Sequence, residues 1–187
     1  MKKAPVLTAV LVFLIAFTAL ATPKKKTKAP KAPITSAQVK SEAPLPTSIP
    51  FGTFNETLAR AAAEKKYVML DFSTDWCKWC KVLDAKTYTD TAVIRLAVRS
   101  FCCAKVDPEK EGRYSYKGKS YDGPGIQSLF HIEGFPTNVF MDSGGNVVGQ
   151  ISGYFPPEKF IRILAFIANG EHKTKSLDEY IGNLNKQ

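Results

Sequence analysis

The sequence predicts an α/β domain in which a central mixed β-sheet is flanked by helices. Three observations lead to this fold class. In the first half of the domain, patterns of buried strands alternate with amphipathic helical patterns, which is typical of parallel strands joined by helices. Two later strand patterns flank Asp142-Ser143-Gly144-Gly145, a turn of the kind that joins antiparallel strands. A helical pattern with an apolar side follows this hairpin and can cover the sheet.

Each element has its own local signal along the chain. Thr53 opens a Thr-x-x-Glu capping box with Glu56, and apolar residues at helical spacing follow, so the first helix is expected there. The later elements are expected, in order, as a buried strand at 67–73, a helix at about 80–86, a helix that begins at Thr89 or Asp90, a strand at 101–106, hairpin strands at 138–141 and 147–151, a helix from Pro156-Pro157 to Asn169-Gly170, and a short helix near Ser176 and Glu179.

Residues 1–21 are predicted to be a signal peptide. Two lysines near the start precede an uncharged apolar run that ends in Ala19-Leu20-Ala21, a small-residue cleavage pattern. Cleavage is expected after Ala21. The alternative is an uncleaved N-terminal membrane anchor, although the run is shorter than the roughly 20 residues that comfortably span a bilayer. The protein is therefore expected to be periplasmic or secreted.

Residues 22–50 are rich in lysine and proline and are expected to form a flexible linker that builds no core. The domain is expected at 51–170, a common size for one core, with a C-terminal extension at 171–187. The formal net charge of the 187-residue chain is +9, but most of this charge lies in the first 50 residues. Because the domain itself is nearly neutral, it is not expected to bind nucleic acid. We expect a monomer.

The most informative motif is Trp76-Cys77-Lys78-Trp79-Cys80-Lys81, directly after the predicted strand at 67–73. At the N-terminus of a helix, Cys77 would be favoured as a thiolate by the helix dipole and by unpaired backbone N–H groups. Cys80, one helical turn further on, could then attack a mixed disulfide formed at Cys77. The spacing predicts a redox-active pair that needs no cofactor besides its own disulfide. The two lysines also favour the thiolate, which leaves open whether the pair reduces or oxidises its partners.

The other two cysteines, Cys102 and Cys103, are adjacent in a predicted strand, where successive side chains point to opposite faces. We expect buried, inert thiols. A zinc site is not expected, because the four cysteines lack the paired spacing of structural zinc sites and because His131 and His172 have no cysteine beside them. A non-catalytic dithiol module that binds copper or zinc is the alternative from a different class of function.

Three motifs follow one another along the predicted elements: Asp71-Phe72-Ser73-Thr74-Asp75-Trp76-Cys77-Lys78-Trp79-Cys80-Lys81, Ala104-Lys105-Val106-Asp107, and Gly134-Phe135-Pro136-Thr137. These motifs and the order of the elements resemble the thioredoxin superfamily over about residues 51–170. The alanine-rich helix before Lys66-Tyr67-Val68 is most similar to exported members, such as the periplasmic C-terminal domains of DsbD-type reductant conductors. The resemblance implies a thioredoxin fold, with an insertion at 108–134 before a cis-proline.

The resemblance assigns roles to the cysteines and to two charged residues. It implies that Cys77 attacks and that Cys80 resolves the mixed disulfide. Asp71 matches a buried carboxylate behind the pair, and burial should raise its pKa so that it can take up the proton that Cys80 loses. Lys105 matches a lysine beside this acid, although it could also be an ordinary lysine at the end of a strand.

Substrate contacts are implied at the surface around the pair. Pro136 matches a cis-proline that faces the disulfide, and Phe135 before it would offer backbone groups to an extended substrate. Trp76 and Trp79 are candidate apolar contacts for a docking partner, but Trp79 could instead cover the disulfide. For the insertion at 108–134 we expect either a substrate-selecting flap on the same sheet edge as Cys77 or a passive surface loop.

The sequence therefore predicts an exported thiol-disulfide oxidoreductase. The resemblance implies that it reduces protein disulfides and that a membrane reductant donor supplies its electrons. A disulfide oxidase or isomerase is the alternative within this class.

Overall fold

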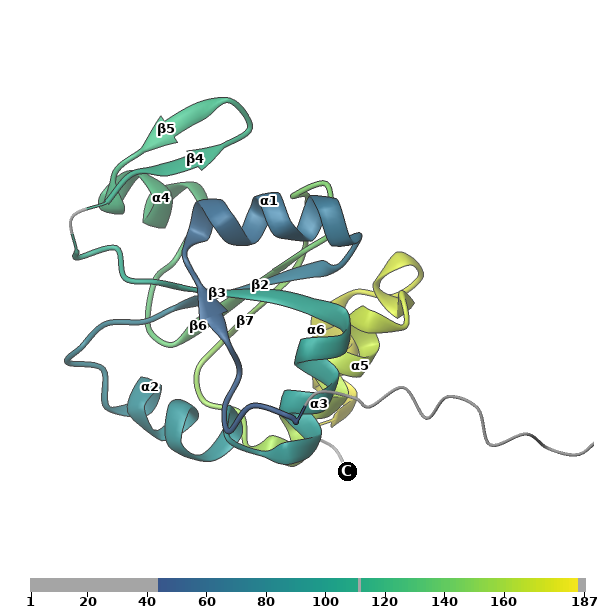
Figure 1. The fold of residues 1–187 in the computed structure, drawn as a ribbon. Helices are drawn as coiled ribbons and strands as arrows, with labels where there is room; N and C mark the ends of the chain where they lie inside the picture. The colour runs from purple at the N-terminus through teal and green to yellow at the C-terminus, as the bar shows by residue number, and fades with distance from the viewer. Residues whose placement is uncertain (1–43, 111, 185–187) are drawn as a thin grey trace, which may run out of the picture. The chain divides into compact units, whose positions relative to one another are not determined.

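The computed structural model describes residues 44–110 and 112–184, and within them a five-stranded mixed sheet has the strand order β1-β3-β2-β6-β7 (Figure 1). The strands β1, β3 and β2 are parallel, whereas β6 runs antiparallel to both of its neighbours, β2 and β7. The predicted mixed sheet is confirmed. Its strands are β1 (Phe51–Gly52), β2 (Tyr67–Phe72), β3 (Phe101–Val106), β6 (Thr137–Met141) and β7 (Val147–Ser152).

Helices cover both faces of the sheet (Figure 1). One core cluster lies between the sheet and α3, α5 and α6, and a second lies between the sheet and α1 and α4. The helical segments are α1 (Phe54–Glu64), α2 (Lys78–Val82), the π-helix η1 (Leu83–Thr87), α3 (Thr91–Ser100), α4 (Gly123–Leu129), α5 (Pro157–Ala168), the 3₁₀-helix η2 (Glu171–Lys173) and α6 (Leu177–Leu184).

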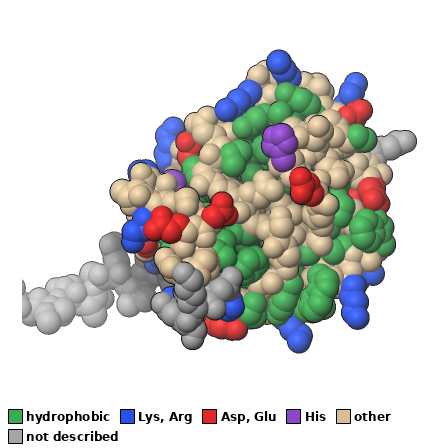
Figure 2. Space-filling view, turned by 180° about the vertical axis from the view of Figure 1, so that it is seen from behind, with side chains coloured by type: hydrophobic (Ala, Val, Ile, Leu, Met, Phe, Trp, Pro, Cys, Tyr) green, Lys and Arg blue, Asp and Glu red, His purple; other side chains and the backbone are tan. Residues whose placement is uncertain are grey.

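The charged side chains are dispersed on one face of the molecule. Figure 2 shows the face opposite to that of Figure 1, where hydrophobic side chains form separate groups and most lysine and arginine side chains stand near the outline. Among the described residues visible on this face, the cations form no continuous basic patch.

Successive residues of the central strands contribute to the two different cores. Cys102 is buried in the cluster with α1, and Cys103 is buried in the cluster with α3. The prediction of two buried thiols on opposite faces is therefore confirmed. Burial raises the pKa of the Cys103 thiol far above its ordinary value, which makes the nucleophilic thiolate inaccessible near neutral pH.

Two of the predicted helix caps can be compared with the structure. Asp90 caps α3, because its carboxylate accepts hydrogen bonds from the backbone N–H groups of Ala92 and Val93. The capping box of α1 is not formed in the expected way. The Thr53 hydroxyl donates a hydrogen bond to the Glu56 carboxylate at 2.7 Å instead of accepting one from the helix backbone. The helix still begins at the predicted place, at Phe54. The side chain of Phe54 is buried in the core cluster of this face of the sheet, so packing stabilises the first turn.

The packed region extends past both ends of the expected 51–170 domain. Ile49 is buried, and its backbone N–H donates to the carbonyl of Tyr88 at 3.0 Å. In the 171–187 extension, Leu177 is buried and the Tyr180 ring stacks on Phe166. The described part of this extension therefore belongs to the fold, because it covers apolar surface of α5 and β7.

The predicted signal peptide at 1–21 and most of the predicted 22–50 linker lie outside the described residues, so both remain predictions. Among the described residues, no helix combines the length and the apolar character needed to cross a bilayer.

The contact between Leu177 and Gly149 provides a test of this packing. A Cβ atom on Gly149 would lie 2.7 Å from Leu177 Cδ2, so the leucine fills the space that the glycine leaves. We expect Leu177→Ala to lower the free energy of unfolding by about 2–4 kcal/mol, the usual cost of truncating a buried leucine. Urea unfolding would measure it, with the exposed Glu179→Ala as a control. A loss below about 0.5 kcal/mol would show that the extension does not contribute to the core.

The 108–134 insertion contains helix α4 and a hairpin, and the hairpin does not cover the disulfide. Its strands are β4 (Tyr114–Tyr116) and β5 (Lys119–Tyr121), and the Tyr116 hydroxyl donates to the carbonyl of Gly145 at 2.8 Å. Gly145 belongs to the β6–β7 turn. Because β6 runs antiparallel to β2, its first residue, Thr137, pairs with the last residue of β2, close to Cys77. The other end of β6, and the turn that follows it, therefore lie at the opposite end of the sheet. The expectation of a flap over the active edge is therefore wrong for the hairpin tip, which is held at the far end by its packing.

Candidate active site

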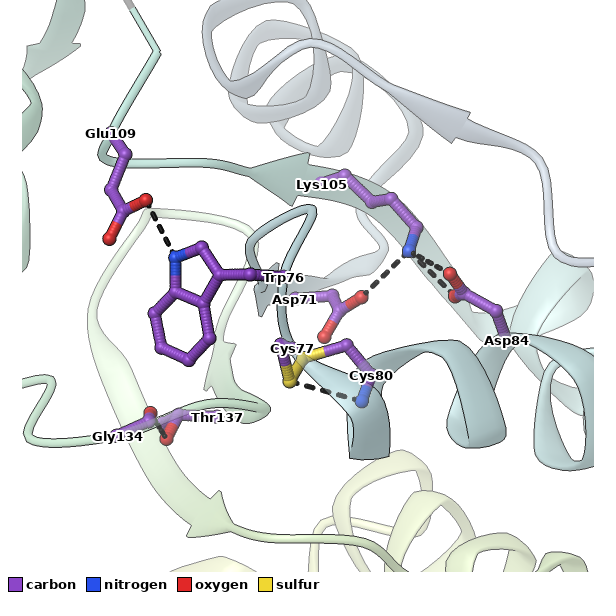
Figure 3. The surroundings of a disulfide bond; sticks show 9 residues. All are labelled: Asp71, Trp76, Cys77, Cys80, Asp84, Lys105, Glu109, Gly134 and Thr137. Carbon is purple, nitrogen blue, oxygen red and sulfur yellow. Dashed lines mark hydrogen bonds and ion pairs between the residues drawn. A yellow bond between two sulfur atoms is a disulfide. The ribbon is translucent and has the colours of Figure 1, made fainter.

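The Cys77–Cys80 pair lies where β2 gives way to α2, and the two sulfur atoms form a disulfide (Figure 3). Cys77 is the N-cap of α2, and its Sγ accepts a hydrogen bond from the backbone N–H of Cys80 at 3.1 Å. Both side chains are buried, with exposed fractions of 4% and 3%. The helix continues through η1, so its N–H groups point toward Cys77 from a segment of ten residues. After reduction, this arrangement favours the thiolate of Cys77 over that of Cys80.

Asp71 lies on β2 behind this pair, and its side chain is buried. Figure 3 shows its carboxyl group between the disulfide and the Lys105 side chain. Burial raises the pKa of Asp71 to about 6, and the nearby Lys105 ammonium partly opposes that rise. One carboxyl oxygen, Oδ1, has no hydrogen-bond partner among the described residues. A carboxyl group with this pKa can both accept and return a proton near neutral pH.

Lys105 lies on β3 and bridges two carboxylates. Its Nζ is 3.3 Å from Asp71 Oδ2, and it contacts the two oxygens of Asp84 at 2.6 and 2.8 Å. Lys105, Asp84 and Cys80 line a cleft of about 750 Å³, whereas the buried Asp71 does not line it. The cleft brings water close to Lys105, which offers a path for proton exchange with the buried acid. Sequence reasoning missed Asp84, although its position four residues after Cys80 places both on one helix face.

Tyr88 and Asn138 form a second buried polar group near Asp71, and sequence reasoning missed both. The Tyr88 hydroxyl donates to Asn138 Oδ1 at 2.9 Å. Asn138 is the partner of Asp71 across the β2–β6 ladder, and its Nδ2 has no hydrogen-bond partner among the described residues. Burial raises the pKa of Tyr88 well above its ordinary value, so the phenol stays neutral. The only sequence signal was the polar residue within the apolar run of β6.

Aromatic side chains surround the disulfide at the surface. Trp76 and Trp79 keep 66% and 56% of their surface exposed, which is unusual for such large apolar side chains. Trp76 meets the ring of Phe135 edge to face, with 5.9 Å between the ring centres. Trp79 stacks instead on Tyr154, with 5.6 Å between the ring centres. Two aromatic pairs thus lie at the surface next to the cysteines, one contributed by each tryptophan.

The Phe135–Pro136 peptide bond is cis, as the resemblance implied. The carbonyl of Pro136 accepts a hydrogen bond from the backbone N–H of Gly153 at 2.8 Å, and the Thr137 hydroxyl donates to the carbonyl of Gly134 at 2.7 Å. These bonds fix the loop that carries Phe135. Of the four predicted substrate contacts, the structure brings Trp76 and Phe135 into direct contact, whereas Trp79 pairs with a residue that was not predicted.

Of the four cysteines, Cys77 and Cys80 form the disulfide, and Cys102 and Cys103 are buried free thiols. In the described ranges, no three or more histidine, cysteine or acidic side chains are grouped so that they could hold a metal ion.

An α/β domain with a Cys-x-x-Cys disulfide at a helix N-terminus, next to a buried acid and a cis-proline, defines a thiol-disulfide oxidoreductase. The chain belongs to the thioredoxin-like domain family, whose family model matches residues 54–168. The recognition of a thioredoxin-like domain and of its fold is therefore confirmed.

Individual relatives agree with this family. The chain is 30% identical over 111 residues to the thiol:disulfide interchange protein DsbD of Ralstonia nicotianae; the match covers 59% of this chain and 17% of that protein. The chain thus spans about a sixth of the length of this relative. Among solved structures, a thioredoxin from Thermus thermophilus is 25% identical, with a TM-score of 0.53 over 64% of this chain and 87% of that one. A thioredoxin-fold protein from Helicobacter pylori, at 19% identity, matches with a TM-score of 0.55 over 66% of this chain and 81% of that one.

Proposed function

We propose that this protein reduces disulfide bonds in protein substrates outside the cytosol. The observation that carries the proposal is the placement of Cys77 at the N-terminus of α2, with Asp71 buried behind the pair. The placement supports a nucleophilic thiol at the helix N-terminus and a proton acceptor in the core behind it. The aromatic surface formed by Trp76 and Phe135 supports a protein substrate, because apolar contacts of this size fit a polypeptide.

The proposed reaction moves two electrons from the dithiol to the substrate. The Cys77 thiolate attacks one sulfur of the substrate disulfide, the substrate S–S bond breaks, and the first substrate thiolate leaves. Cys80 then gives its proton to the Asp71 carboxylate and attacks the Sγ of Cys77. The mixed disulfide breaks, the second substrate thiolate leaves, and the Cys77–Cys80 disulfide remains. The proton on Asp71 returns to the leaving thiolate or to water in the cleft beside Lys105.

Continued turnover requires a donor that reduces the Cys77–Cys80 disulfide again. We propose a membrane reductant donor in the periplasm, reached by a chain whose residues 1–21 direct its export. The predicted leader supports this location, and so does the similarity to proteins named thiol:disulfide interchange protein DsbD. Exchange of a dithiol with a disulfide is the same chemistry on the donor side, so no separate cofactor is required.

Insulin reduction tests the proposed reaction. We expect the reduced full chain to cleave insulin disulfides while its own Cys77–Cys80 pair becomes oxidised, at one substrate disulfide per pair. Cys103→Ala serves as a control, because this buried thiol lies outside the exchange reaction. Absence of insulin cleavage, together with tight binding of Cu(I) or Zn(II) to the dithiol, would support the non-catalytic metal-binding alternative instead.

A further inference from the structure

The segment that follows β3 returns to the active-site loop and is tied to it at two points. The indole Nε1 of Trp76 donates a hydrogen bond to Glu109 Oε2 at 2.8 Å (Figure 3). Next to it, Lys110 Nζ lies 3.1 Å from Asp75 Oδ1 and 3.3 Å from Asp107 Oδ2. The Asp107 carboxylate also accepts the backbone N–H of Glu109 at 3.1 Å. The base of the insertion, residues 107–110, is therefore connected to the loop directly before Cys77.

The orientation of the Trp76 ring depends on few contacts. With 66% of its surface exposed, the side chain is not held by burial. Within the described residues, the interactions that orient the ring are its edge-to-face contact with Phe135 and its hydrogen bond to Glu109. A hydrogen bond to an ionised carboxylate is stronger than one between neutral groups. Removal of the carboxylate would leave the indole free to take other rotamers.

We propose that Glu109 is a positioning residue for protein substrates: its carboxylate holds the Trp76 indole against Phe135 and so presents a preformed aromatic wall next to Cys77. The wall fits an apolar, extended segment beside the substrate cysteine. A ring that is already fixed loses less conformational entropy when a substrate docks on it. The inference rests on the proposed reduction of protein disulfides, and it assigns a task to the base of the insertion, whose hairpin tip lies at the far end of the sheet.

The test compares Glu109→Ala with Glu109→Gln in the full chain. Alanine removes the acceptor, whereas glutamine keeps an acceptor oxygen and removes the charge. We expect Glu109→Ala to raise the KM for insulin roughly threefold to tenfold with little change in kcat, in line with the cost of immobilising one side chain. Glu109→Gln should stay within about twofold of the parent, since its amide oxygen can still accept the indole N–H. Hydroxyethyl disulfide is too small to reach the wall, so its reduction rate should not change.

Glu133→Ala is the matched control, because Glu133 is an exposed carboxylate in the same 108–134 segment. An unchanged KM in Glu109→Ala, with active parent protein, overturns the inference and leaves the proposed function intact. Equal increases in the KM for insulin in Glu109→Ala, Glu109→Gln and Glu133→Ala would assign the effect to the loss of negative charge. This result would also overturn the inference. A slower reaction with hydroxyethyl disulfide would place the effect at the cysteines and likewise contradict the inference.

A second readout does not depend on turnover. In a Trp79→Phe background, the fluorescence anisotropy of the remaining Trp76 reports how firmly its ring is held. Glu109→Ala should lower this anisotropy, and Glu109→Gln should largely restore it. If the parent protein failed to reduce insulin, the proposed function would fall, while lower anisotropy would still support the positioning of Trp76. An anisotropy that does not respond to Glu109→Ala contradicts the positioning itself.

Discussion

Replacing Cys77 with serine is expected to lower the rate of disulfide exchange by roughly a thousandfold or more, because the hydroxyl cannot replace the thiolate as nucleophile. Cys80→Ser is expected to behave differently. Its Cys77 can still attack, but no thiol follows to resolve the mixed disulfide, so a covalent complex with the substrate should accumulate. Insulin turnover and non-reducing gel electrophoresis measure the two outcomes.

The asymmetry between the two cysteines follows from their positions. Cys77 caps α2 and receives the Cys80 N–H at its sulfur, whereas Cys80 lies one turn inside the helix. Cys102→Ala is the control, since that thiol is buried in the α1 core and forms no disulfide. Accumulation of the covalent complex in Cys77→Ser rather than in Cys80→Ser would reverse the assigned roles.

The second large effect is expected from Asp71→Asn. The amide cannot accept the proton of Cys80, so resolution of the mixed disulfide should slow by roughly a hundredfold. The rate of the parent protein should rise with pH through an inflection near 6, because the pKa of Asp71 is raised to about 6 by burial and only the ionised form accepts the proton. This inflection should be missing in Asp71→Asn. Stopped-flow kinetics over pH 4–9 would measure both.

The stability of the protein should change in the opposite sense to its activity. The pKa of Asp71 is about 6 in the fold against an ordinary 3.8, so between these values the folded state binds more protons than the unfolded state. Stability should therefore fall as pH rises from about 4 to 6 and then level off. At pH 8, Asp71→Asn should stabilise the protein by up to roughly 3 kcal/mol, at 1.36 kcal/mol per pKa unit.

Urea unfolding at several pH values tests this linkage, with the exposed Asp178→Asn as the control. The control should follow the parent curve at each pH. Two results would show that burial does not penalise the charged form of this carboxylate. One is a lower free energy of unfolding in Asp71→Asn than in the parent protein at pH 8. The other is the same change of that free energy between pH 4 and 6 in both proteins.

The sequence allowed the main elements to be predicted because their hydrophobic periods are clear. The strand at 101–106 was predicted with its observed bounds, and Cys77 was predicted at the start of its helix. Both depend on local patterns alone. The cis-proline and the fold came from the resemblance to a known superfamily, which supplied three-dimensional information that no local pattern contains.

The features that were missed depend on contacts between distant segments. Tyr88 follows η1 and Asn138 lies on β6, so their hydrogen bond joins segments 50 residues apart that give no local signal of the contact. The β4–β5 hairpin was missed because its strands are only three residues long. Ile49 was assigned to the linker because prolines surround it, and its burial is decided by the core that it meets. For such short segments and single residues, the structure is decided by tertiary packing and not by the local sequence pattern.

The reduction potential of the Cys77–Cys80 pair tests the central claim most directly. The protein would be equilibrated in glutathione buffers at pH 7, and the fraction of disulfide would be measured at each ratio. We expect a value near −270 mV, about that of thioredoxin, which would make the dithiol an effective reductant of protein disulfides. A value near −120 mV, about that of a strong oxidant of secreted thiols, would contradict the proposed reductase.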